Sequence, residues 1–186
     1  MLEAFLVSTG LVAIGEIGDK TQLLSLVLAA RFRRPWPIVA GIFAATLANH
    51  TVAGGIGAWI TATVGIDTMR KVVGVSFLAM AAWALVPDRI DEGEAMREVR
   101  GGVFWTTVVL FFMAEMGDKT QLATMALAAR YPSLAAVVAG TTLGMLAADA
   151  PVVFFGDAIG KRVPIRVVRR IASAFFAILG VLALMP

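Results

Sequence analysis

Long apolar runs dominate this 186-residue chain, and short charged clusters separate them. Several runs exceed the roughly 20 residues that an α-helix needs to cross a bilayer. Because lipid cannot hydrogen-bond to open backbone groups, each run is expected to be helical. The predicted spans are residues 4–30, 36–62, 68–86, 102–129, 133–160 and 167–185. The pattern therefore predicts an all-α, polytopic membrane protein with six transmembrane helices.

Composition agrees with a membrane protein and excludes other classes. Hydrophobic residues make up 59% of the chain and charged residues only 16%, whereas about a quarter of a soluble domain is charged. The chain contains no cysteine, which excludes a disulfide framework and a thiolate metal site. The isoelectric point is near 9.8, but basic loops set the topology of membrane proteins. We therefore expect no nucleic-acid partner.

The distribution of lysine and arginine predicts the orientation. Eleven of these residues fall in loops one, three and five, and three fall in loops two and four. The positive-inside rule assigns the richer loops to the cytoplasm. Both termini are then predicted to be extracytoplasmic.

The chain matches itself without a gap when it is shifted by 99 residues. Residues 19–23 fall on residues 118–122, and Gly57 falls on Gly156. The predicted units are a first three-helix repeat at 1–86, a cytoplasmic linker at 87–101 and a second three-helix repeat at 102–186. Three spans per unit make the repeats inverted, within a single membrane domain. Inverted repeats are common in secondary transporters, whose sites lie at the repeat interface.

One motif occurs once in each repeat, as EIGDKTQ at 16–22 and EMGDKTQ at 115–121. In an unbroken helix, the Glu, Asp and Lys of each copy would share one face. However, Gly18 and Gly117 weaken the helix, and 27 residues of span one would measure roughly 40 Å against a core of about 30 Å. A break or a steep tilt would absorb the excess. Broken helices at membrane depth line ion sites in many transporters.

If the two motifs meet at the repeat interface, they bring together four carboxylates and two ammonium groups. The predicted metal ligands are Glu16, Asp19, Glu115 and Asp118. The predicted supporting residues are Lys20, Thr21, Gln22, Lys119, Thr120, Gln121, Asn49, His50 and Asp149. One divalent cation or two protons would cancel the net charge of minus two, which favours metal-for-proton exchange. Oxygen ligands suit hard cations such as Ca²⁺, Mg²⁺ and Mn²⁺.

A purely structural interpretation is that Glu16–Lys20 and Glu115–Lys119 are i,i+4 pairs that only neutralise each other. A charge at the centre of a span costs about 2.5–3.5 kcal/mol even on the lower insertion scale. Such pairing would also leave both aspartates without partners. The charges therefore favour a functional site.

Other polar residues lie inside predicted spans two and five. Asn49 and His50 fall on Ala148 and Asp149 under the shift of 99 residues. A lone histidine is compatible with packing as well as with proton or metal handling, and both interpretations stay open. Asp149 is the stronger candidate because a kink is expected at the neighbouring Pro151.

The two motifs resemble those of a known family of cation/proton exchangers, which carry E-x-G-D-[KR]-[ST] twice on duplicated three-span units. The matching residues are 16–21 and 115–120, and the length, span count and duplication agree over the whole chain. The family includes bacterial manganese exporters of the MneA type and Golgi and thylakoid relatives that move Mn²⁺ and Ca²⁺. Many relatives have Arg-Ser in one copy where this chain has Lys-Thr in both, which leaves ion preference open.

The resemblance implies that the four acids form the cation site. It also implies export of Mn²⁺, with Ca²⁺ as the second candidate, in exchange for protons across a bacterial inner membrane. No cofactor is expected beside the transported ions. The expected partners are membrane lipid and a divalent metal ion, and the sequence is compatible with a homo-oligomer.

Two other functions remain as alternatives. Compact six-span exporters of basic amino acids exist, and paired acids could hold an ammonium group. A structural subunit without transport is the third interpretation. The near-identical motifs favour a small symmetric ion over an asymmetric solute. The chain has no nucleophile–base set and no phosphate-binding loop, so no enzymatic activity is expected.

Overall fold

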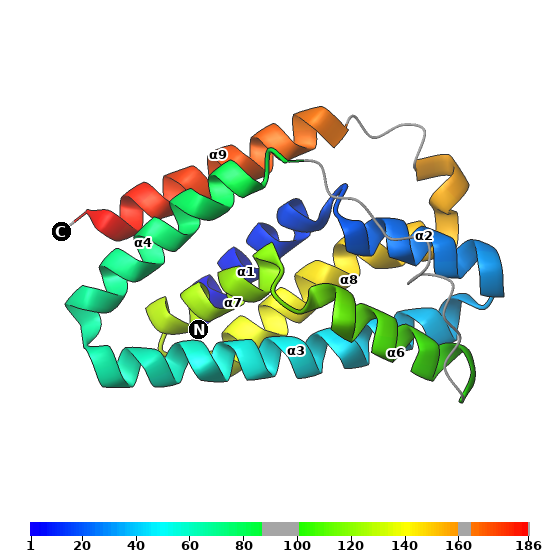
Figure 1. The fold of residues 1–186 in the computed structure, drawn as a ribbon, viewed down its shortest axis with the longest axis horizontal. Coiled ribbons are helices and arrows are strands. Elements are labelled where there is room, and N and C mark those ends of the chain that lie inside the picture. The colour runs from blue at the N-terminus through cyan, green and yellow to red at the C-terminus, as the bar shows by residue number, and fades with distance from the viewer. Residues whose placement is uncertain (87–100, 160–164, 186) are drawn as a thin grey trace.

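The computed structural model describes residues 1–86, 101–159 and 165–185 (Figure 1). Within these ranges the regular secondary structure is entirely α-helical, as the sequence predicts. The helices are α1 (Leu2–Glu16), α2 (Lys20–Phe32), α3 (Pro35–Val64), α4 (Ile66–Trp83), α6 (Gly102–Glu115), α7 (Lys119–Arg130), α8 (Leu134–Ile159) and α9 (Ile165–Leu184). Except for Gly101, the predicted linker at 87–101 lies outside the described residues.

Predicted spans one and four are each divided into two helices. The first divides between α1 and α2, and the second divides between α6 and α7. Of the break or steep tilt that span length and glycine content predicted, the structure has the break. The shared face expected for an unbroken helix is therefore absent, because the backbone turns between the Glu and the Asp of each motif.

Two helices among the described residues are long and apolar enough to cross a membrane. They are Pro35–Val64 and Leu134–Phe155, with mean hydropathies of 1.3 and 1.6. The second stretch belongs to α8, which also contains Pro151. The non-helical residue in α8 is Phe155 (φ −132°, ψ 20°). The kink thus lies four residues beyond the proline, not at the Ala150–Pro151 step next to Asp149.

The first and second halves of the chain interlock. Helix α3 packs mainly on α6, α7 and α8, and α8 packs mainly on α1, α3 and α2. Glycines permit the closest approaches: a Cβ atom on Gly41 would lie 2.9 Å from the carbonyl oxygen of Phe104, and one on Gly140 would lie 2.5 Å from that of Phe5. These two contacts are equivalent under the shift of 99 residues. Each long helix is therefore buried against the opposite half.

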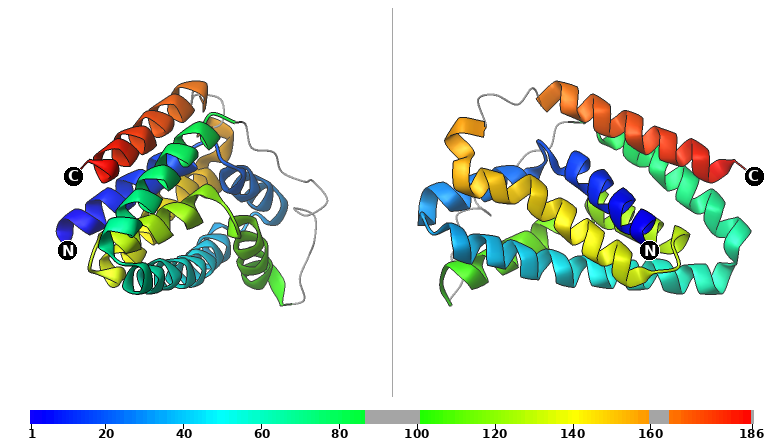
Figure 2. Two further views of the ribbon diagram at one scale, coloured as in Figure 1. Left: turned by 60° about the vertical axis from the view of Figure 1, so that its left-hand side comes forward. Right: turned by 180° about the vertical axis from the view of Figure 1, so that it is seen from behind.

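Helices α4 and α9 form a pair of their own at one side of the molecule (Figures 1 and 2). Gly74 and Gly180 face each other, since a Cβ atom on either would lie 3.0–3.1 Å from the other's carbonyl oxygen. The rings of Phe77 and Phe176 lie 6.2 Å apart between the helices. The pair contacts the rest of the protein mainly through α7 and α1, the helices next to the breaks.

The glycine run at 54–57 provides a matched test of this packing. A Cβ atom on Gly57 would lie 2.2 Å from the carbonyl oxygen of Met125 on α7, whereas one on Gly55 would meet nothing within 4 Å. We expect Gly57→Ala to destabilise the protein by about 1–3 kcal/mol, because the backbone of α7 must move. Gly55→Ala should leave stability unchanged or slightly raised. Thermal unfolding in detergent measures both, and equal melting temperatures would contradict the α3–α7 contact.

Candidate metal centre

Both helix breaks have the same backbone geometry. Ile17 has φ −64° and ψ 114°, and Gly18 has φ 82°. In the second motif, Met116 has φ −64° and ψ 119°, and Gly117 has φ 76°. The amide of each motif aspartate donates to the carbonyl of the glutamate three residues earlier, at 3.0 and 3.2 Å. These values define a type II β-turn, whose third position requires the positive φ that glycine tolerates.

The E-x-G-D sequence thus codes for a turn that carries an acid at each end. Glu16 ends α1, and Asp19 is the N-cap residue of α2. A carboxylate at a helix N-terminus is favoured by the helix dipole, while a helix C-terminus favours a cation. Glu16 and the last carbonyls of α1 therefore add negative potential at the same point. Glu115 and Asp118 have the equivalent positions between α6 and α7.

The remaining motif residues hold the turn and the glutamate in place. Gln22 Oε1 accepts a hydrogen bond from the Gly18 amide at 2.8 Å, and Gln121 Oε1 accepts one from the Gly117 amide at 2.7 Å. The hydroxyl of Thr21 donates to Glu16, and that of Thr120 donates to Glu115. The backbone amide of each motif glycine and the hydroxyl of each motif threonine therefore find their hydrogen-bond partners within their own motif.

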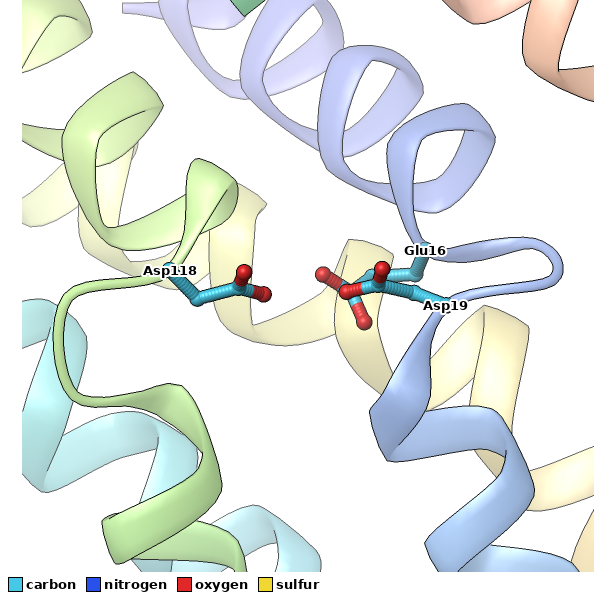
Figure 3. Close-up of side chains that lie close together, drawn as sticks. All are labelled: Glu16, Asp19 and Asp118. Atoms are coloured by element: carbon cyan, nitrogen blue, oxygen red, sulfur yellow. The ribbon is translucent and has the colours of Figure 1, made fainter. Parts of the chain in front are cut away.

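Three carboxylates from the two turns converge. One oxygen each from Glu16, Asp19 and Asp118 lies within 4.8 Å of the others, and the side chains point towards one another (Figure 3). All three residues are at most 2% exposed. Opposite oxygens around a bound Ca²⁺ would be about 4.6–5.2 Å apart at bond lengths of about 2.3–2.6 Å. The cluster thus has the size of a cation coordination sphere.

The lysines of the motifs pair across the centre. Lys119 Nζ donates to Asp19 Oδ1 at 2.5 Å, and Lys20 Nζ lies 3.5 Å from Asp118 Oδ1. Each lysine therefore contacts the aspartate of the other motif, unlike the i,i+4 pairing within one motif that the structural interpretation assumed. The side chain of Lys119 is 5% exposed and that of Lys20 is 27% exposed.

Glu115 is buried but lies outside the group of three carboxylates. Its Oε2 accepts the Thr120 hydroxyl at 3.1 Å and lies 3.6 Å from Nε2 of His50. The two glutamates, which are equivalent in sequence, thus have different surroundings.

The predicted polar residues of α3 and α8 surround the centre. Gln121 Nε2 donates to Asn49 Oδ1 at 2.6 Å, and Gln22 Nε2 donates to the carbonyl of Ala148 at 3.1 Å. Asp149 accepts a hydrogen bond of 2.8 Å from Ser25. Asn49 and Ala148 occupy equivalent positions under the shift of 99 residues. The glutamine of one motif therefore donates to a side-chain oxygen, and that of the other motif donates to a backbone carbonyl.

Several buried oxygens of the centre have no hydrogen-bond donor among the described residues. They include Oε1 of Glu16, Oε1 of Glu115, Oδ2 of Asp118 and Oδ2 of Asp149. A buried anionic oxygen without a partner is costly. Such oxygens are available to coordinate a cation.

Ser25 is the buried partner that the sequence analysis missed. It is 0% exposed and binds Asp149. Under the shift of 99 residues it falls on Thr124, which is also fully buried. A hydroxyl side chain occurs at this position in both repeats, and this pattern could have identified Ser25 from the sequence.

Comparison with known proteins identifies the family of this chain. The sequence model of the family described as "Divalent cation/proton antiporter GDT1" matches residues 4–92 and 103–186. The chain belongs to this GDT1 family. The resemblance inferred from the sequence is thereby confirmed, and so is the expectation of a membrane transporter instead of an enzyme.

Curated relatives of the GDT1 protein extend from bacteria to plants. A protein of Vibrio cholerae named "Putative manganese exporter" is 45% identical over 181 residues, which cover 97% of this chain and 90% of the relative. The GDT1-like protein sll0615 of Synechocystis is 28% identical, with 98% and 97% covered. The PAM71-homolog of Arabidopsis thaliana is 23% identical, with 94% and 57% covered. No solved structure matches the chain significantly.

The type II turn leads to a prediction about Gly117. A Cβ atom there would meet nothing within 4 Å, so only the positive φ opposes a side chain. We expect Gly117→Ala to cost about 1–2 kcal/mol through backbone strain and to lower cation transport by misplacing Glu115 and Asp118. Gly10→Ala, in an open helical position, is the control that should retain wild-type behaviour. Thermal unfolding and ion uptake that are unchanged in Gly117→Ala would contradict the turn.

Proposed function

We propose that this GDT1 protein exports Mn²⁺ from the cytoplasm in exchange for protons, by alternating access. The observation that carries the proposal is the group of three buried carboxylates, contributed by both broken helices, with oxygens within 4.8 Å of one another. Glu16, Asp19 and Asp118 are the proposed ligands in this conformation. Glu115 is the fourth ligand, which joins when the turns move relative to each other.

The ligand chemistry supports a hard divalent cation. Carboxylate oxygens suit Mn²⁺, Ca²⁺ and Mg²⁺, whereas thiolates and imidazoles select softer metals. The relative from Vibrio cholerae, which is named "Putative manganese exporter", supports Mn²⁺ as the cargo. Ca²⁺ is the second candidate, because flexible oxygen sites accept it at similar distances.

Charge balance supports coupling to protons. The four motif acids and two motif lysines leave two negative charges, which either one metal ion or two protons would neutralise. Burial makes an uncompensated charge costly during any movement of the site across the membrane. Exchange of one divalent ion for protons therefore keeps the charge of the moving site nearly constant.

We further propose six spans arranged as two inverted repeats, with both termini extracytoplasmic and the protein in a bacterial inner membrane. In Figures 1 and 2, the termini lie towards the end of the molecule that holds the α3–α4 and α7–α8 connections, and α2 ends and α3 begins at the other end. Helix α1 runs away from the terminal end, and α6 runs towards it. This arrangement supports inversion, and the arginines at 31, 33 and 34 support a cytoplasmic location for the opposite end.

The transport prediction concerns the acids of the centre. In proteoliposomes, we expect Mn²⁺ uptake to be accompanied by proton efflux, followed with an internal metal dye and an internal pH dye. Glu16→Gln and Asp118→Asn should each lower uptake by about 100-fold or more, because a ligand is lost from a small, buried coordination sphere. Glu3→Gln is the matched control, since Glu3 is exposed and lies outside the centre.

The same assay separates the competing functions. Flux that persists in Glu16→Gln would show that the ligands are assigned wrongly. Ca²⁺ competition tests selectivity. Arginine or lysine flux without metal flux would favour the solute exporter instead, and no flux of either kind would favour a structural role.

Topology can be tested without removing native cysteines, because the chain has none. We expect a membrane-impermeant thiol reagent to label Leu2→Cys and Met185→Cys in intact spheroplasts. Gly93→Cys, in the predicted cytoplasmic linker, should react only after the membrane is permeabilised. Labelling of Gly93→Cys in intact spheroplasts would reverse the proposed orientation, and labelling of only one terminus would rule out an even number of spans.

A further inference from the structure

We propose that Lys119 and Lys20 are tethered counter-cations of the transport site. When the metal ion has left, each ammonium group neutralises an aspartate of the opposite motif, and the incoming metal ion must displace it. This inference rests on the proposed function. It adds that the lysines of the two motifs compete with the metal ion for the aspartates.

The contacts of Lys119 carry the argument. Its ammonium group lies 2.5 Å from Asp19 Oδ1, and Asp19 is one of the three converging carboxylates. An ammonium group at this distance occupies one oxygen of the carboxylate. A divalent ion and the ammonium group repel each other at such short range, so both cannot hold the same small cluster with full strength.

The surroundings of Lys119 offer a second position for its charge. The ammonium group lies 6.0 Å from the centre of the Trp83 ring on α4, within the range of a cation–π interaction. A small pocket beside the Asp19–Lys119 pair is lined by Gly15 of α1, by Ile17 and Gly18 of the first turn, and by Ala84 and Ala172. We expect the ammonium group, once displaced from Asp19, to remain beside the indole ring.

Lys20 makes the equivalent contact less tightly. Its distance to Asp118 is 3.5 Å, and its side chain is 27% exposed, against 5% for Lys119. Lys20 is therefore held less tightly against its aspartate, and its replacement should have the smaller effect. Replacing Lys20 and replacing Lys119 should therefore have the same kind of effect, with a smaller magnitude for Lys20.

The device matters most for the return of the metal-free carrier, which the proposed exchange loads with protons. Without its lysines, the metal-free site would hold additional uncompensated negative charge in a medium where charge is costly. The metal-free site would then move across the membrane slowly. The metal-loaded site would keep a cation at its centre and would continue to move.

The experiment compares Mn²⁺ binding with two modes of transport in Lys119→Met. At mildly alkaline pH, we expect the apparent Kd for Mn²⁺ to fall about tenfold, because no ammonium group competes for Asp19. In proteoliposomes, net Mn²⁺/H⁺ antiport should fall about tenfold more than Mn²⁺/Mn²⁺ exchange, since exchange does not require the metal-free carrier to cross the membrane. Lys119→Arg should restore both values towards wild type.

Controls separate this role from a structural one. Lys71→Met removes an exposed lysine away from the centre and should behave as wild type. Lys20→Met should change both values in the same direction as Lys119→Met but less, and it carries the test if Lys119→Met does not fold. Weaker or unchanged Mn²⁺ binding, with exchange and antiport falling together, would overturn the inference. Wild-type protein that binds no Mn²⁺ would instead overturn the proposed function as well.

Discussion

Buried carboxylates need positive charge beside them, and this requirement organises the centre of the protein. Asp19 obtains it from Lys119, and Asp118 lies next to Lys20. Each half of the chain thus supplies the cation that an acid of the other half needs. The remaining oxygens of Glu16 and Asp118 have no donor among the described residues, so the lysines neutralise the centre only in part. A divalent ion is the natural supplement, consistent with membership of a divalent cation/proton antiporter family.

The type II turn explains why the acids can meet at all. A continuous helix would spread Glu16 and Asp19 over one rigid face. The turn at Gly18 instead ends one helix and begins the next, so that both carboxylates reach towards the opposite motif (Figure 3). The same torsion angles recur at Gly117, and the glutamine and threonine of each motif fix the turn by local hydrogen bonds. The residues of each motif therefore specify the turn and the hydrogen bonds that hold it.

The interlocked packing sets limits on how such a site can move. Helices α3 and α8 are buried against the opposite half through close glycine contacts, so the halves cannot separate as simple rigid bodies. The α4–α9 pair is attached mainly through α7 and α1, which adjoin the two turns. Movement of this pair would therefore act directly on the carboxylates. Trp83 and Ala84 at the end of α4 lie beside the Asp19–Lys119 pair.

The sequence by itself determined the helices, the breaks at the motif glycines and the burial of the acids. These features follow from local properties: hydropathy, the positive φ of glycine and the cost of charge in lipid. It did not determine the partners of those acids, because they lie 65 to 124 residues away along the chain. Tertiary packing decided that Lys119 contacts Asp19, that His50 stands beside Glu115 and that Ser25 binds Asp149. Nearly identical motifs acquired different surroundings because the helices packed around them, α3 and α8, differ at Asn49/Ala148 and His50/Asp149.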